Sequence, residues 1–250
     1  ISGMTGHNNG NNRYIKIGAY SFRQNYPLVS FTGINMDLTG GKSKGHAFRQ
    51  CSSITSLATL TTNSNTIPTS TFADSGINTL VGMPSTITTF GESAFANCKL
   101  SDLDGIPTGV SSFGIRCFEG CKNLVDISGI EGTQVTSLPD YCFANCTSLE
   151  QIVEKLSGIA LPSRIDTIGE YCFQNCTQIT FIKLAKWQST ASRKITYLGD
   201  TNADTNVFPY ADINENTGFQ ILVPSGSLSA YLSEWGTPNR FDNAAFSEYS

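Results

Sequence analysis

The sequence predicts a single solenoid of about eight stacked coils, and three observations point to this fold class. The segment GEYCFQNC (Gly169–Cys176) has a near-copy in PDYCFANC (Pro139–Cys146) and a looser copy in GIRCFEGC (Gly114–Cys121). The phenylalanine of this segment recurs at spacings of 26, 24, 23, 23, 25, 30 and 35 residues. The apolar residues around it recur in the same order. Such self-similarity at a short period is typical of stacked supersecondary units.

Each coil is marked by one phenylalanine and by a fixed set of neighbours. An apolar residue precedes the phenylalanine by five positions in most coils, and a cysteine follows it by three positions in five coils. Two aliphatic residues come after that. The period lies in the range of roughly 20–29 residues that is typical of leucine-rich repeats. The marker residues are Phe22, Phe48, Phe72, Phe95, Phe118, Phe143, Phe173 and Phe208.

The parts of one coil have different expected structures. The Leu-x-x-Ile segments, such as Leu124–Ile127, are expected to be short strands that pair from coil to coil. The Ala-Phe-x-x-Cys segments, such as Ala94–Cys98, are expected to be short helical turns. Gly91, Gly114 and Gly169 follow the apolar residue five before phenylalanine. We expect tight bends with positive φ there, which glycine adopts freely.

Stacking must form continuous columns in the core, because one coil cannot bury its apolar face alone. We expect a column of phenylalanines and a column of cysteines, clearest in four successive coils. The slot directly before the phenylalanine holds Cys117, Cys142 and Cys172 where other coils carry Ala, Ser or Thr. It is therefore a slot for small residues. The two columns comprise Phe95, Cys98, Phe118, Cys121, Phe143, Cys146, Phe173 and Cys176.

The eight cysteines admit a disulfide, a zinc or a free-thiol interpretation. Neighbouring coils lie roughly 4.8 Å apart, so adjacent cysteines would be within disulfide reach. Their side chains, however, point the same way into a packed core, where free cysteine behaves as a small hydrophobic residue. The spacing also lacks the paired knuckles of a zinc site. Buried free thiols are the prediction.

Composition excludes some classes of function. Charged residues make up only 14% of the chain and the net charge is −4, with Lys and Arg scattered along it. Nucleic-acid binding needs a clustered basic face, so no nucleic-acid partner is expected. No stretch approaches 18 apolar residues, so this segment has no predicted membrane span. We expect a monomer.

The sequence offers little for catalysis. Nucleophilic catalysis needs a base close to a Ser, Thr or Cys. The two histidines are His7, in a Gly/Asn-rich tail, and His46, at a coil position expected to be exposed. Nothing in the sequence links either of them to a nucleophile. We therefore predict that the chain is not an enzyme.

One segment has the spacing of a metal site. In DTNADTN, Asp200, Asn202 and Asp204 match positions one, three and five of a calcium loop. Thr205 and Ala211 stand where the motif needs glycine and an acidic residue, so a plain polar insertion is the alternative. No other cofactor is expected.

Two Asn-Cys-Thr triplets are formal N-glycosylation acceptors. They span Asn145–Thr147 and Asn175–Thr177. Both overlap the predicted cysteine column, which is buried. We therefore expect neither to be modified.

Surface positions supply the candidate binding residues. The positions two before phenylalanine include Tyr20, His46, Arg116, Tyr141 and Tyr171, and stacking makes the last two neighbours. Exposed tyrosine offers contact area with little loss of side-chain entropy, which suits contact with protein or sugar. The alternative is an ordinary solvated face.

A tryptophan is a further candidate. Trp187 lies in the insertion AKWQSTASRK before coil eight, which should project as a loop. It is either an exposed anchor or a plug at a hinge.

Three segments resemble the BspA-like leucine-rich repeats, whose pattern is roughly V-x-x-I-G-x-x-A-F-x-x-C-x-x-L. They are ITTFGESAFANCKLSDL, VSSFGIRCFEGCKNLVDI and IDTIGEYCFQNCTQITFI. The tail FQILVPSGSLSAYLSEWG (Phe219–Gly236) is similar to the strand and the Tyr/Trp-bearing helix that cap such arrays in gut-bacterial surface proteins. The resemblance covers Tyr14 to Trp235. It departs from the pattern in coil two, which lacks a clean Ile-Gly turn, and in the insertion of coil eight.

This resemblance implies a domain organisation and a function. We expect a flexible N-terminal segment (1–13), the solenoid (14–218) and a C-terminal cap (219–250) of the same domain. The family implies a secreted or surface-displayed bacterial protein, and thus a non-enzymatic adhesion module for host matrix proteins, cell-surface proteins or glycans. The alternative is a spacer or stalk within a larger surface protein. An extended repeated surface suits both, and the adhesive function rests on the resemblance alone.

Overall fold

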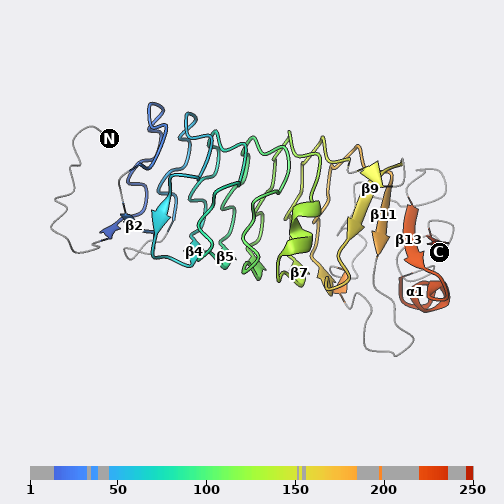
Figure 1. Ribbon diagram of the computed structural model, residues 1–250. Coiled ribbons are helices and arrows are strands. Elements are labelled where there is room, and N and C mark those ends of the chain that lie inside the picture. Colours follow the sequence, from blue (N-terminus) through green and yellow to red (C-terminus); the bar gives the residue numbers. More distant parts are fainter. Residues whose placement is uncertain are drawn as a thin grey trace.

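The coils of the chain lie side by side in one row (Figure 1). The computed structural model describes residues 14–32, 35–38, 45–150, 152–153, 156–184, 197–198, 220–235 and 246–249. Within these residues the chain passes through seven of the eight expected coils, from the one marked by Phe22 to the one marked by Phe173. Phe208, the marker of the eighth coil, lies outside them. The predicted solenoid is confirmed.

The coils are built mainly from very short strands. Only one α-helix is present in the described residues, together with one 3-10 helix. In chain order the elements are β1 (Ile15–Lys16), β2 (Asn35–Asp37), β3 (Thr61–Thr62), β4 (Thr66–Ile67), β5 (Thr89–Phe90), β6 (Ser112–Phe113), η1 (Ser128–Gly132), β7 (Ser137–Leu138), β8 (Ile152–Val153), β9 (Leu156–Leu161), β10 (Thr167–Ile168), β11 (Phe181–Leu184), β12 (Tyr197–Leu198), β13 (Gln220–Pro224), α1 (Leu228–Trp235) and β14 (Phe246–Tyr249).

The strands form four sheets along the solenoid axis. Three sheets have three strands each, in the orders β1-β2-β3, β4-β5-β6 and β12-β10-β7. The fourth has five strands in the order β14-β13-β11-β9-β8. All described strand pairs are parallel except β8 with β9. Parallel pairing follows because each coil repeats the direction of the coil before it.

Most strands occupy a different part of the coil than the sequence predicts. β4, β5, β6, β7 and β10 contain the apolar residue five before phenylalanine, so that Ile67 pairs with Phe90 and Phe90 with Phe113. Among the described residues, strands reach the ends of the predicted Leu-x-x-Ile segments in coils six and seven, where β8 begins at Ile152 and β11 at Phe181. In earlier coils they make isolated links, such as the bridge between Ser56 and Thr79.

The segments expected to be short helical turns are successive turns bounded by left-handed residues. In every described coil, the residues two before and two after the phenylalanine have φ between 48° and 70°. L-residues adopt this region at a cost of roughly 1–2 kcal/mol each. These residues are Tyr20, Gln24, His46, Gln50, Ser70, Asp74, Ser93, Asn97, Arg116, Gly120, Tyr141, Asn145, Tyr171 and Asn175.

This backbone conformation lets each turn pair with the next one. Ser93, Phe95 and Asn97 donate their N–H groups to carbonyl oxygens of coil five at 2.9, 3.0 and 2.7 Å. The same three bonds join every consecutive pair of coils from coil two to coil seven. Because the donors are every second residue, the turn behaves like a strand in pairing while it still reverses the chain.

The phenylalanine column is the centre of the core. Consecutive rings from Phe22 to Phe173 lie 5.2 to 5.9 Å apart between centroids, with interplanar angles of 4° to 14°. Phe90 and Phe113 pack edge-on against this column, at 75° to Phe95 and 89° to Phe118. Such ring pairs contribute about 0.5–1.5 kcal/mol each beyond the burial of their area.

The glycines of the Ile-Gly pairs are required for close approach and not for positive φ. None of Gly91, Gly114 and Gly169 has a positive φ, so that expectation is wrong. A Cβ atom at Gly114 would lie 2.4 Å from the backbone nitrogen of Glu92 in the preceding coil. In coil one, the equivalent Gly18 would meet only the Ser21 hydroxyl, at 3.4 Å. The glycine is therefore needed where another coil packs behind it.

A strand and a helix close the C-terminal end, as the sequence predicts. β13 pairs with β11 and is followed by α1, whose Tyr231 is buried. A further strand that the sequence did not predict, β14, pairs with β13. Its Glu248 carboxylate accepts the N–H groups of Gly226 and Leu228 at 2.9 and 3.0 Å, which satisfies donors at the start of α1. Within the described residues no helix has both the length and the apolar character to cross a bilayer.

The phenylalanine column predicts a large loss of stability when one ring is removed. Phe118 is fully buried between Phe95 and Phe143. Phe118→Ala should lower the free energy of unfolding by roughly 3–5 kcal/mol, as for other buried aromatic residues. Urea unfolding measures the change, with Ile115→Ala, at a side chain that is 43% exposed, as the control. Equal losses of stability in the two variants would contradict the burial of Phe118 in a stacked phenylalanine column.

Candidate functional site

Two rows of side chains run along the turns of the solenoid. They belong to the left-handed residues two before and two after each buried phenylalanine, and most of them are exposed or half-buried. We call these two rows the turn ridge. The first row contains five of the candidate binding residues, and the second is mostly Gln, Asp and Asn.

Arg116, Tyr141 and Tyr171 stack in consecutive coils of the first row. The two tyrosine rings lie 4.8 Å apart between centroids at an interplanar angle of 17°. The Arg116 guanidinium lies 4.1 Å from the centre of the Tyr141 ring, and its Nε pairs with the Glu119 carboxylate at 3.2 Å. Partly exposed cation–π contacts of this kind contribute roughly 0.5–1 kcal/mol. The result is an ordered aromatic surface with a cation at one end.

Tyr20 and His46 form a second stack in coils one and two. Their rings lie 4.8 Å apart at 6°, and Arg23 lies 5.7 Å from the Tyr20 ring. His46 was expected to be exposed, but it is half-buried and its Nδ1 is buried without a hydrogen-bond partner. Burial, together with the charges of Arg49 and Arg23, lowers the pKa of His46. His46 is therefore a neutral ring at neutral pH.

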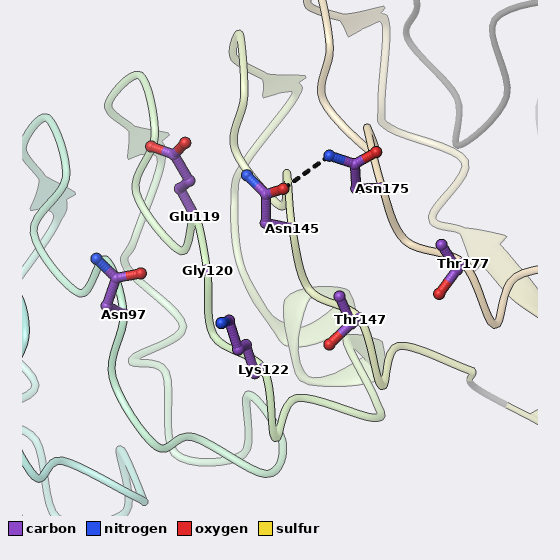
Figure 2. Close-up of a pocket in the computed structure, with 8 residues that line it drawn as sticks. All are labelled: Asn97, Glu119, Gly120, Lys122, Asn145, Thr147, Asn175 and Thr177. Atoms are coloured by element: carbon purple, nitrogen blue, oxygen red, sulfur yellow. Dashed lines mark hydrogen bonds between the residues drawn. The ribbon is translucent and has the colours of Figure 1, made fainter.

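A polar groove of about 580 Å³ follows the second row across coils four to seven (Figure 2). Inside it, Asn175 Nδ2 donates to Asn145 Oδ1 at 2.8 Å. Sequence reasoning missed this groove because it gave no role to the position two after phenylalanine. The recurrence of Asn and Gly there was the available signal for left-handed residues. The groove is lined by Asn97, Glu119, Gly120, Lys122, Asn145, Thr147, Asn175 and Thr177.

Both Asn-Cys-Thr triplets border this groove. Cys146 and Cys176 are buried, as expected. Asn175, Thr147 and Thr177 are exposed, however, and Asn145 is half-buried. The buried cysteines therefore do not bury the asparagine and threonine side chains on either side of them.

A second hollow, of about 380 Å³, is lined by Glu131, Arg164 and Lys183 together with residues 160–163. Its cations are engaged by the protein itself. Arg164 donates to the carbonyl oxygen of Ile130, and the Lys183 ammonium lies 4.1 Å from the centre of the Tyr249 ring.

Four candidate residues lie outside the described residues. They are Trp187 and the three predicted calcium ligands, Asp200, Asn202 and Asp204. In the part of the chain that the structure describes, no group of three or more His, Cys, Asp and Glu side chains could hold a metal ion.

The repeat chemistry of the coils matches a known family. The model of the BspA type leucine-rich repeat region fits six copies in this chain, over residues 9–125, 42–154 and 106–202. The chain belongs to the BspA-type leucine-rich repeat family. No curated protein matches it.

One solved structure shares the fold of this BspA-type chain, and two more distant ones are also matched. A leucine-rich repeat protein from Bacteroides ovatus ATCC 8483 is 22% identical with a TM-score of 0.54, over 85% of this chain and 49% of that one. The chain thus spans about half the length of that protein. A leucine rich cell surface protein from Faecalibacterium prausnitzii A2-165 is 14% identical, with a TM-score of 0.33 over 94% and 83% of the two chains. The pneumococcal vaccine antigen PcpA is 12% identical, with a TM-score of 0.21 over 79% and 70%.

All eight cysteines of this BspA-type chain are unpaired and buried. The cysteines that lie three residues after a phenylalanine bond to the preceding coil. The Cys121 thiol, for example, donates to the carbonyl oxygen of Phe95 at 3.2 Å. Burial raises the pKa of Cys98 to about 12 and raises that of Cys142 as well. The thiols therefore stay protonated at neutral pH, and a protonated thiol is a poor nucleophile and metal ligand.

These raised pKa values predict that the BspA-type solenoid loses stability above pH 9. An unfolded thiol ionises near 9.0, whereas Cys98 ionises near 12 in the folded chain. Between these values the unfolded state releases protons that the folded state keeps. The free energy of unfolding should therefore be insensitive to these thiols at neutral pH and fall above pH 9, by up to about 1.4 kcal/mol per pH unit for each such thiol. Urea unfolding from neutral pH to about pH 11 measures this fall.

Cys142→Ala is the matched variant, because Ala94 fills the equivalent slot in coil four. Above pH 9 the free energy of unfolding of this variant should fall less steeply with pH than that of the wild type, by the contribution of one thiol. A thiol reagent should label few cysteines in the native wild-type chain and all eight after denaturation. Rapid labelling of the native chain would contradict the burial argument.

Proposed function

We propose that the chain is a non-enzymatic binding module, secreted or displayed on a bacterial surface, that makes adhesive contacts through its turn ridge. Membership of the BspA-type family supports a surface repeat module. The observation that carries the binding role is the stack of Arg116, Tyr141 and Tyr171. The proposed partners of the chain are proteins or glycans of a host matrix or cell surface.

The stack has the properties of a contact surface. Tyr and Arg are enriched at the energetically important positions of interfaces. Here the three side chains are held by one another, and their coils are joined by backbone hydrogen bonds. A partner would therefore immobilise few free rotamers, which favours affinity.

The non-enzymatic part of the proposal rests on the fold and on the state of the described groups. Leucine-rich-repeat solenoids are generally non-enzymatic. The buried cysteines have raised pKa values, and the Nδ1 atom of His46 has no hydrogen-bond partner. A nucleophile with an adjacent base, as acyl or phosphoryl transfer would need, is not formed by these groups.

A spacer is the second candidate function. The continuous phenylalanine column and the bonds between turns favour it, because they make the row of coils stiff. A spacer needs the core alone, whereas a binding module needs particular side chains on the ridge. The two functions therefore differ in their response to ridge substitutions.

The binding role predicts that Tyr141→Ser with Tyr171→Ser weakens ligand binding without unfolding the chain. Ser70 and Ser93 occupy the same row in other coils, so serine suits this backbone. We expect affinity to fall about tenfold or more, as for aromatic anchors of interfaces. Host matrix proteins, mucins and a glycan panel are the probes, with and without a calcium chelator.

Tyr26→Ser is the control, because Tyr26 is 55% exposed and lies outside the ridge. Equal binding by wild type and the double variant would exclude the stack as the contact surface. No binding by wild type to any probe would favour the spacer.

A further inference from the structure

We propose that the polar groove on coils four to seven binds a neutral oligosaccharide. This inference rests on the proposed binding function and gives it a ligand class. The groove joins the aromatic stack through Glu119, which lines the groove and also pairs with Arg116. Figure 2 shows its side chains, which come from successive turns.

The lining of the groove suits an uncharged, hydroxyl-rich ligand. Glu119 and Lys122 carry opposite charges, and the other side chains are carboxamides and hydroxyls. Polyanions are recognised by clustered cations, and the groove has a single one. Protein partners depend on aromatic or aliphatic anchors in apolar pockets, and no apolar side chain lines the groove. A neutral sugar chain is the ligand that remains.

The Asn145–Asn175 pair leaves a donor beside an acceptor. Asn145 uses its carbonyl oxygen as acceptor and Asn175 uses its amide as donor in their mutual bond of 2.8 Å. The amide of Asn145 and the carbonyl oxygen of Asn175 are left for a ligand. A sugar hydroxyl both donates and accepts, so neighbouring hydroxyls match this arrangement. In the described part of the chain, Thr147 and Thr177 add hydroxyls that have no side-chain partner.

The groove is preorganised by the backbone beneath it. Asn145 donates its backbone N–H to the carbonyl oxygen of Gln174 at 2.7 Å, which fixes coil six against coil seven. The side chain of Asn97, in coil four, is held by the hydrogen bond that its Nδ2 donates to Asp74 Oδ1 of coil three at 2.9 Å. A Cβ atom at Gly120 would come within 2.1 Å of Asn97 Oδ1, so the missing side chain at coil five keeps the groove open. A polar site with few side chains left to order loses less entropy on binding.

Asn145→Asp and Thr177→Val test the groove with minimal change of shape. Asp74 occupies the same row with a φ of 60°, so aspartate suits the backbone at residue 145. Asn145→Asp keeps the acceptor for Asn175 and removes the donor offered to the ligand. The matched controls are Asn123→Asp and Thr136→Val, at exposed side chains outside the groove.

The probes are an immobilised panel of neutral oligosaccharides of hexose and N-acetylhexosamine, their sulfated counterparts, and peptides from matrix proteins. Wild type should bind neutral members of the panel. Each groove variant should weaken that binding about five- to tenfold, the effect of one lost hydrogen bond. The two controls should leave it unchanged.

The outcomes separate this inference from the proposed function. Binding of neutral oligosaccharides that both groove variants leave intact would overturn the groove as the site. Binding of peptides or sulfated glycans alone, lost in the Tyr141→Ser and Tyr171→Ser variant, would overturn the ligand class and support the proposed function. Failure of wild type to bind any probe would overturn both.

Discussion

The solenoid depends on the hydrogen bonds that pass from the turn of one coil to the turn of the next. From coil two to coil six, three N–H groups of each turn, on every second residue, reach the following coil. The middle donor belongs to the phenylalanine, whose ring is thereby held in register with its neighbours. The cysteine three positions later donates its thiol hydrogen to the carbonyl oxygen of the phenylalanine in the preceding coil. That buried oxygen thereby gains a second hydrogen-bond partner. Core packing thus follows from backbone pairing.

The same pairing separates the surface from the core. Forming it requires two left-handed residues in each coil, at a cost of roughly 1–2 kcal/mol for each residue other than glycine. Hydrogen bonds worth about 0.5–1.5 kcal/mol apiece and the burial of the ring oppose that cost. Side chains of different chemistry tolerate this conformation, since Tyr20, Ser93 and Arg116 all occupy one row. The turn ridge can therefore change its chemistry without disturbing the phenylalanine column.

The sequence predicts the columns well because a buried slot restricts residue type at a fixed spacing. The phenylalanine column and the unpaired cysteines follow from that rule, and the meeting of Tyr141 with Tyr171 follows from the same spacing at a surface position. Backbone conformation leaves a weaker signal, because Tyr, Ser and Arg are poor indicators of a left-handed residue. The sequence therefore predicts helical turns around the phenylalanine and bends of positive φ at the glycines, neither of which the structure shows in the described coils. The groove follows a row of residues two after phenylalanine, whose spacing is in the sequence, but only the structure shows that a hollow lies along it. The Glu248 contact to α1 joins residues that share no repeat position, so the spacing of the coils does not predict it.

The residues of the first row bear on the choice between a binding module and a spacer. At this left-handed position the fold is satisfied by Ser70 and Ser93 in coils three and four. Coils five to seven carry Arg116, Tyr141 and Tyr171 instead, which are larger and less suited to positive φ than Asn or Gly. Their mutual stacking recovers part of that cost, and all three side chains are half-buried. A spacer needs no aromatic or cationic side chain at this position, whereas the proposed contact surface uses all three, and the polar groove on coils four to seven overlaps them.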